Sequence, residues 1–407
     1  MSQSIKKERL PQLDLFRAMA IFCVIQVHSS SFAAAEQALN SPIYYFYNWM
    51  NIFFKIGTPC FIFLSSFVLF YNYYDRPVNK ELIGHFYKKR LTYIILPYIL
   101  VSCCYFLLVA WQRGELASNS KMYELQQLGM KLLTGTSYTH LYFVFISIQF
   151  YILFPLLLWL FQSFRKSKIL LALIIPLGLA IQYGFYFWNK VELHIPNKGS
   201  YAPSYMAYYF MGAGIAIYFE HLKGWLKSDW KDMSGKQKMW TGLLWGSWLI
   251  VAFTHVQIWF SYRQHWSSPN STWFEVLWNV HTLLSALVLM RASFLIQRKG
   301  SAFWNKALTR LGELSFAVYL FHPVVLLYYR KLRDHFTIPG DSAMYFLYII
   351  GGSACALAIS WVFTQVCFRR LPFASVFLGS VPYSLKKKKK APGMHGPGQD
   401  RTVKMNG

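Results

Sequence analysis

The chain has 407 residues and a formal net charge of +25, and 55% of its residues are hydrophobic, 19% aromatic and 14% charged. Soluble domains usually carry about 25% charged residues, so this composition excludes an ordinary water-soluble fold. The basic excess does not indicate a nucleic-acid-binding protein, because the lysines and arginines lie in short connections between apolar segments.

Ten apolar segments are long enough, or nearly so, to cross about 30 Å of hydrocarbon as a helix. Each is expected to be helical because lipid offers no partner to an open backbone. The sequence therefore predicts an all-α integral membrane protein, a bundle of about ten transmembrane helices. In chain order the predicted spans are Leu13–Phe32, Asn51–Tyr71, Leu91–Trp111, Thr139–Phe161, Ile169–Phe187, Pro203–Phe219, Trp240–Phe260, Trp273–Leu295, Leu311–Tyr329 and Ala343–Phe368.

Lysine and arginine cluster in alternate connections between these spans. The positive-inside rule makes the basic side cytoplasmic, which places both termini there. We expect a cytoplasmic segment over residues 1–12, a transmembrane domain over 13–370 and a basic, disordered cytoplasmic tail over 371–407. The tail contains the run Lys386–Lys390 and has no hydrophobic periodicity.

The first span, LDLFRAMAIFCVIQVHSS, contains Arg17 and His28. Eleven helical positions return to nearly the same face with an axial rise of about 16 Å, so the two side chains share one stripe at two depths. Charged groups inside a membrane segment are costly and indicate a functional site. The alternative is that Arg17 reaches to the cytoplasmic surface while His28 caps the outer end of the helix.

Two acidic residues flank this pair. Asp14 lies one turn before Arg17, where an ion pair could orient the guanidinium; alternatively, it is a capping residue at the helix start. Glu36 lies about two turns after His28 and could polarise it or meet a substrate, or it could be a plain loop residue outside the membrane.

Other polar residues fall in or near later spans. Lys88, Lys89 and Arg90 precede the third span and form a basic cytoplasmic mouth. His322 is a candidate site residue because Pro323, which follows it, frees a backbone carbonyl within the helix. Tyr319, one turn earlier, is its candidate neighbour. Alternatively, His322 is a histidine whose hydrogen bonds are satisfied by a neighbouring helix. Candidates for lining a cavity are His140, Gln149, Tyr151 and Lys55, whereas no role follows from the sequence for His255, His281, Glu275 and Arg291.

Common catalytic motifs are absent from the sequence. It has no glycine-rich phosphate loop, Gly-x-Ser-x-Gly elbow or His-Glu-x-x-His helix, which argues against a P-loop pump, a typical serine hydrolase and a zinc protease. The six cysteines fall inside predicted spans without metal-ligand spacing, so we expect no metal site.

Six segments of the sequence resemble the acyltransferase 3 family of multi-spanning membrane proteins. The Arg-x10-His segment resembles the first-helix signature of that family. The others, in family order, are GTPCFIFLSSF, FYKKRLTYIILPY, HLYFVFISIQFYILFPL together with YMAYYFMGAGIA, and LGELSFAVYLFHPVVL. Three positions depart from the family pattern: Ser66 stands for a glycine, Tyr93 for a second arginine and Phe316 for a tyrosine. The first departure bears on close helix packing and the second on the donor site.

The resemblance implies transfer of an acyl group, usually acetyl, from cytoplasmic acyl-coenzyme A to a hydroxyl of an exported or extracytoplasmic glycan. Within the family the chain resembles stand-alone members associated with exopolysaccharides such as poly-N-acetylglucosamine, described both as exporters and as O-acyltransferases. This implies a multi-pass protein of a bacterial cell membrane, whose partners are the bilayer, a glycan and a glycan synthase or export machinery. The competing functions are glycan export without acyl transfer and a non-catalytic role beside a synthase.

The required chemistry assigns roles to the candidates. Acyl transfer to an alcohol needs a base for the hydroxyl, and the ordinary pKa of histidine, about 6.5, suits His28 to this task. The planar fork of Arg17 matches phosphate or a thioester carbonyl. With Lys88, Lys89 and Arg90 it would hold the phosphates of the donor.

Overall fold

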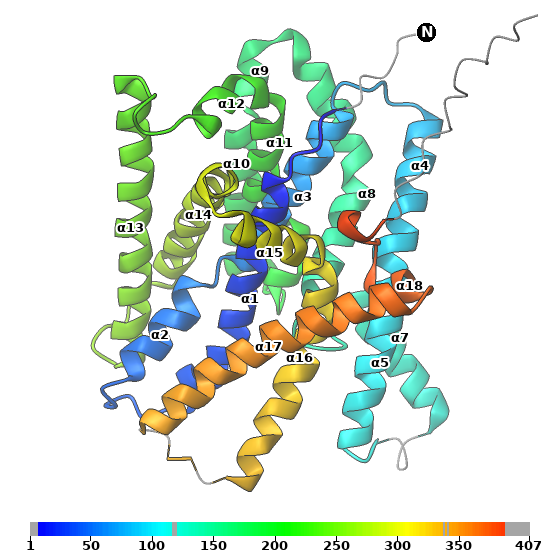
Figure 1. The fold of residues 1–407 in the computed structure, drawn as a ribbon, viewed down its shortest axis with the longest axis vertical. Helices are drawn as coiled ribbons and strands as arrows, with labels where there is room; N and C mark the ends of the chain where they lie inside the picture. Colours follow the sequence, from blue (N-terminus) through cyan, green and yellow to red (C-terminus); the bar gives the residue numbers. More distant parts are fainter. Residues whose placement is uncertain (1–6, 116–119, 337, 340–341, 387–407) are drawn as a thin grey trace, which may run out of the picture.

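The protein is described here from a computed structural model, which covers residues 7–386 apart from 116–119, 337 and 340–341. The described chain is helical (Figure 1). The helices are α1 (Gln12–Glu36), α2 (Tyr44–Phe53), α3 (Gly57–Tyr73), α4 (Lys80–Arg90), α5 (Leu96–Gln112), α7 (Lys121–Thr134), α8 (Tyr142–Ser163), α9 (Lys168–Ala172), α10 (Ile174–Trp188), α11 (Met206–Ile217), α12 (Phe219–Lys227), α13 (Gly235–Arg263), α14 (Ser271–Lys299), α15 (Ala302–Glu313), α16 (Ser315–Lys331), α17 (Ala343–Arg370) and α18 (Ala374–Leu378).

Short 3-10 or π-helical turns join several of these helices. They are η1 (Leu91–Ile95), η2 (Phe164–Lys166), η3 (Asn189–Leu193), η4 (Lys198–Ser200), η5 (Ala202–Tyr205), η6 (Leu332–His335) and η7 (Tyr383–Leu385).

Seven helical stretches in the described part of the chain are long and apolar enough to cross a membrane, or eight if the bent pair α15–α16 forms one span. Seven of the ten predicted spans are thereby accounted for, and the bent pair would account for an eighth. The other two correspond to α9–α10 and α11, whose longest helices have 15 and 12 residues. Their assignment as spans, like the cytoplasmic location of both termini, stays a prediction.

The ninth predicted span is not one straight helix. The chain bends by 78° between α15 and α16. Gly312, near the end of α15, explains the direction of that helix: a β-carbon there would lie 1.7 Å from the carbonyl oxygen of Asp14 in α1. Because only a residue without a side chain allows this approach, α15 packs backbone to backbone across the start of α1 (Figure 1).

The first helix lies in the middle of the bundle, whereas α13 stands at its edge (Figure 1). In the most apolar stretch of α1, 61% of the residues are buried, whereas in that of α13 only 17% are buried. A helix that is apolar and largely unburied by protein faces lipid, so α13 is peripheral and α1 is central. The position of α1 places Arg17 and His28 inside the protein.

Ser66 in α3, which departs from the glycine of the resembled family pattern, faces a glycine on the neighbouring helix α11. A β-carbon at Gly212 in α11 would lie 2.3 Å from the carbonyl oxygen of Phe63 and 3.0 Å from the Ser66 side chain. The Ser66 hydroxyl donates to the carbonyl of Tyr209 at 2.5 Å. Close packing of α3 on α11 is therefore retained, with the small residue supplied by α11.

The first part of the predicted disordered tail, residues 371–386, is folded in the structure. Residues 371–386 are described and include α18 and η7. The Arg9 guanidinium lies 3.9 Å from the ring centroid of Tyr383, and the Ser384 hydroxyl donates to Glu313 at 2.5 Å. These contacts hold the segment against the start of α1 and the end of α15. The rest of the predicted tail, 387–407, lies outside the described residues.

Candidate functional site

Arg17 lines a cavity of about 280 Å³ whose wall includes residues of α1, α3, α8 and α16. The predicted ion pair with Asp14 is present, at 2.6 Å between Arg17 Nη1 and Asp14 Oδ1. Asp14 also accepts from Arg9, which reaches Glu313 at 2.6 Å. The buried carboxylate of Asp14 thus holds one edge of the Arg17 guanidinium beside the cavity.

A second arginine, Arg90, lines the same cavity. Its guanidinium carbon lies 4.8 Å from the ring centroid of Tyr151, which also lines the cavity. Lys88 and Lys89 are exposed on α4 and are absent from the cavity wall. The structure therefore brings Arg17 together with Arg90 and leaves both lysines on the outside. We call this cavity, with its two arginines, the inner cavity.

Three histidines from three separate segments meet beyond the inner cavity. The ring centroids of His28 in α1 and His322 in α16 are 5.2 Å apart, and those of His322 and His140, just before α8, are 5.7 Å apart. Tyr319, predicted as the neighbour of His322, lies 5.8 Å from it between centroids and lines the inner cavity. The Tyr319 hydroxyl donates to the carbonyl of His140. These four side chains form what we call the histidine cluster.

Hydrogen bonding defines the protonation pattern of His322. Its Nδ1–H donates to the carbonyl of Tyr319 at 2.8 Å, within the helix turn opened by Pro323. The neutral ring therefore carries its lone pair on Nε2. Among the described residues, this buried atom and both ring nitrogens of His140 have no hydrogen-bond partner in the protein. Buried polar atoms are normally paired, so unpaired nitrogens in one cluster indicate a functional site.

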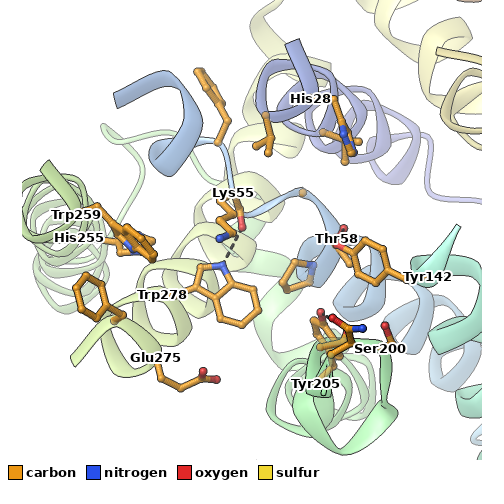
Figure 2. Close-up of a pocket in the computed structure, with 18 of the residues that line it drawn as sticks. His28, Lys55, Thr58, Tyr142, Ser200, Tyr205, His255, Trp259, Glu275 and Trp278 are labelled. Atoms are coloured by element: carbon orange, nitrogen blue, oxygen red, sulfur yellow. Dashed lines mark hydrogen bonds between the residues drawn. The ribbon is translucent and has the colours of Figure 1, made fainter. Parts of the chain in front are cut away.

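His28 lines a second cavity, of about 540 Å³, on the other side of the cluster (Figure 2). We call it the outer cavity. Its polar and aromatic wall includes Lys55, Thr58, Tyr142, Ser200, Tyr205, His255, Trp259, Glu275 and Trp278. The helices lining this cavity contribute their predicted extracytoplasmic ends. In the inner cavity α1 and α16 contribute their predicted cytoplasmic ends, whereas α8 lines both cavities from its predicted extracytoplasmic half.

The two cavities are separated by about one helical turn. On α3, Thr58 lines the outer cavity and Phe61 the inner one; on α8, the neighbours Tyr142 and Phe143 do the same. The ring centroids of Phe61 and Phe143 are 5.8 Å apart, and Phe143 lies 5.2 Å from Tyr319. This thin aromatic layer and the histidine cluster form the partition.

Glu36 lies away from the outer cavity. It forms an ion pair with Arg333 at 3.5 Å and lines a separate cavity of about 330 Å³ with Arg330. Arg330 instead reaches the site, because its Nη2 donates to the backbone carbonyl of His28 at 2.5 Å. Sequence reasoning did not find this contact, and the only local signal was the Arg330–Lys331 pair at the end of α16.

Comparisons with known proteins identify the family of the chain. The family model of the acyltransferase domain, acyltransferase 3, matches residues 10–365. Two proteins of Staphylococcus aureus, from strains MRSA252 and MW2, are 25% and 26% identical over 336 residues. Each match covers 81% of this chain and 84% of the relative, and both are named "Probable poly-beta-1,6-N-acetyl-D-glucosamine export protein". No solved structure matches the chain significantly.

Proposed function

Because the chain belongs to the acyltransferase 3 family, whose model spans most of its length, we propose that it is a membrane-bound O-acyltransferase. The acyl group, typically acetyl, moves from cytoplasmic acyl-coenzyme A to a hydroxyl of an exported or extracytoplasmic glycan. The observation that supports this most strongly is the histidine cluster, which lies between an arginine-lined inner cavity and a larger outer cavity.

The inner cavity suits the donor. Arg17 and Arg90 offer planar forks that match phosphate oxygens, as the phosphates of coenzyme A require. Arg17 and His28 lie on the continuous helix α1, so about 16 Å of axial rise separates their backbones. This distance is comparable to the reach of an extended pantetheine arm. A donor held by the two arginines would present its thioester at the histidine cluster.

The outer cavity suits the acceptor, and His28 is the proposed general base. A ring nitrogen of His28 accepts the hydroxyl proton as the sugar oxygen bonds to the thioester carbonyl carbon. The carbon–sulfur bond then breaks, the coenzyme A thiolate leaves, and the proton held by His28 passes to the thiolate, which restores the neutral base. Arg330 holds the backbone of His28, while the ring packs on His322. Both contacts limit the movement of the base.

Glycan export without chemistry is the second candidate, and the names of the Staphylococcus aureus relatives favour it. The two functions are separated by incubating the protein in proteoliposomes with labelled acyl-coenzyme A and a panel of glycans. Label on the glycan supports the acyltransferase. If a glycan crosses the bilayer and no combination of acyl-coenzyme A and glycan gives labelled glycan, export is the function. The same proteoliposomes with a co-purified synthase would test a partner role.

Replacing the inner-cavity arginine should weaken donor binding. Arg17→Met removes charge-assisted hydrogen bonds to the donor phosphates, so we expect the KM for acyl-coenzyme A to rise about ten-fold or more. The KM for the glycan should stay within about two-fold. The measurement is initial transfer rate against donor concentration at saturating glycan.

Lys236→Met is the matched control for this prediction, because Lys236 is an exposed cation near the start of α13, at the predicted cytoplasmic end. It should leave the donor KM unchanged. An unchanged donor KM in Arg17→Met would remove Arg17 from the donor site.

A further inference from the structure

Lys55 lies in the break between α2 and α3, three positions before Thr58, and its side chain is open to the outer cavity (Figure 2). The indole N–H of Trp278 donates to the Lys55 carbonyl at 2.9 Å. This bond ties the break to α14 and fixes where the side chain starts. The break is therefore a structured element that carries a lysine into the cavity wall.

The ammonium group of Lys55 makes no ion pair with any carboxylate of the described residues. Among the residues that the structure describes, no carboxylate lies within 4.0 Å of its Nζ, and its recorded contact is with the Trp259 ring, 5.5 Å from Nζ to centroid. The span from Tyr44 to Tyr73 has the length and hydropathy of a membrane segment. Lys55 itself is exposed to the cavity. A cation within such a segment normally pairs with another group or serves a substrate path.

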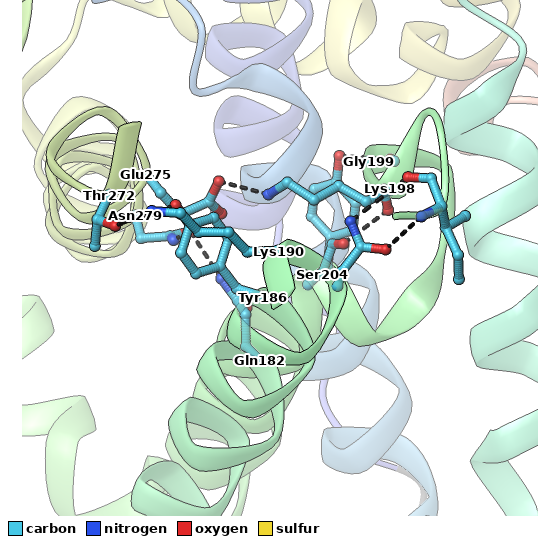
Figure 3. A network of polar contacts seen from close by, with 12 residues as sticks. Gln182, Tyr186, Lys190, Lys198, Gly199, Ser204, Thr272, Glu275 and Asn279 are labelled. Atoms are coloured by element: carbon cyan, nitrogen blue, oxygen red, sulfur yellow. Dashed lines mark hydrogen bonds and ion pairs between the residues drawn. The ribbon is translucent and has the colours of Figure 1, made fainter. Parts of the chain in front are cut away.

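Glu275 is the acidic residue of the described outer cavity wall, and it is already committed elsewhere (Figure 3). Its Oε2 accepts from Lys198 Nζ at 2.6 Å, and its Oε1 accepts from Asn279 Nδ2 at 3.2 Å. Asn279 Oδ1 in turn accepts from Gln182 at 2.7 Å and from the Tyr208 hydroxyl at 2.5 Å. This network holds Glu275 to Lys198, so Glu275 acts on Lys55 only through space and forms no ion pair with it.

We propose that Lys55 binds an anionic group, a carboxylate or a phosphate, on the substrate that occupies the outer cavity. The inference rests on the proposed function and adds the charge of the substrate to it. Trp259 and Trp278 provide apolar faces beside the ammonium, against which a sugar ring or acyl chain packs. The anionic group belongs either to the acceptor glycan or to the far end of a dicarboxylic acyl group, since both enter the same cavity.

The test compares matched anionic and neutral probes, first in binding and then in transfer. For the acceptor, glucose 6-phosphate is compared with glucose; for the donor, malonyl-coenzyme A is compared with acetyl-coenzyme A. Equilibrium binding to the purified protein in detergent is measured for wild type, Lys55→Gln and Lys55→Arg. We expect wild type to prefer the anionic member of one pair by about ten-fold or more, because a charge-assisted contact has roughly that value.

Lys55→Gln should lose that preference, whereas Lys55→Arg should keep most of it, and the pair affected identifies the source of the anion. Lys190→Gln is the control, since Lys190 is exposed at the same end of the bundle and its ammonium donates to Thr272 at 3.0 Å. Equal binding of both members of both pairs by wild type, or a preference that persists in Lys55→Gln, would overturn the inference.

The transfer assay separates this inference from the proposed function. Transfer that shows no dependence on the charge of donor or acceptor in wild type supports the acyltransferase and contradicts the role of Lys55. If anion binding depends on Lys55 but the protein transfers no acyl group, the proposed acyltransferase activity is wrong and the proposed anion site at Lys55 stands. Lys55→Arg guards against a folding defect in Lys55→Gln.

Discussion

The His28→Ala variant is expected to lose acyl transfer by about 10²- to 10⁴-fold in kcat, because removal of a general base typically has an effect of this size. The fold should survive the change. Arg330 bonds to the backbone carbonyl of His28, and a backbone carbonyl is retained in alanine. Donor binding should also survive, since Arg17 lies about three turns away on the same helix.

The measurement is transfer of labelled acetyl from coenzyme A to a glycan at saturating concentrations of both. His85→Ala is the control, because His85 is an exposed histidine on α4; it should retain full activity. His322→Gln tests the neighbouring ring. A loss larger in His322→Gln than in His28→Ala would move the base to Nε2 of His322, and a loss below ten-fold in both variants would contradict catalysis by the cluster.

The Gly312→Ala variant is expected to destabilise the protein by about 3 kcal/mol or more, the upper range for overpacking. The added β-carbon would lie 1.7 Å from the carbonyl oxygen of Asp14, so α15 must move away from α1. Asp14 orients Arg17, and the displacement should therefore raise the donor KM as well. The measurement is the thermal unfolding midpoint in detergent, together with donor kinetics in any folded fraction.

Gly246→Ala is the matched control for Gly312→Ala. It is also a glycine within a helix, but a β-carbon at Gly246 in α13 would meet no atom within 4 Å. Alanine favours the helical state over glycine by up to about 1 kcal/mol, so this variant should be as stable as wild type or slightly more stable. Equal midpoints for the two variants would show that α15 is not held by this close approach.

Much of the helical framework could be predicted from the sequence because apolar length is a local property. The spans around Arg17 and His28, and around Tyr142 and Ala343, appear as helices with ends a few residues from those predicted. The Asp14–Arg17 ion pair was equally predictable, since residues three apart on a helix are neighbours. The bend between α15 and α16 was not, because it depends on what Gly312 packs against.

The same distinction applies to the candidate site. Sequence resemblance marked His28 and His322 separately, but it could not place His140 beside them or Arg330 on the His28 carbonyl. Residues far apart in the chain meet only when their helices pack. Glu36 shows the reverse case. It lies about two helical turns from His28, but its ion-pair partner, Arg333, comes from η6 and draws it to a separate cavity.

By itself, the sequence determined that this is a helical membrane protein and that Arg17 and His28 share a face of one helix. These properties follow from hydrogen bonds within one segment, which lipid makes obligatory. Only the tertiary structure decided which cations line a cavity: Arg90 and Lys55 do, whereas Lys88 and Lys89 do not. That choice depends on how small residues and side-chain shapes allow separate helices to approach, and helical periodicity does not encode it.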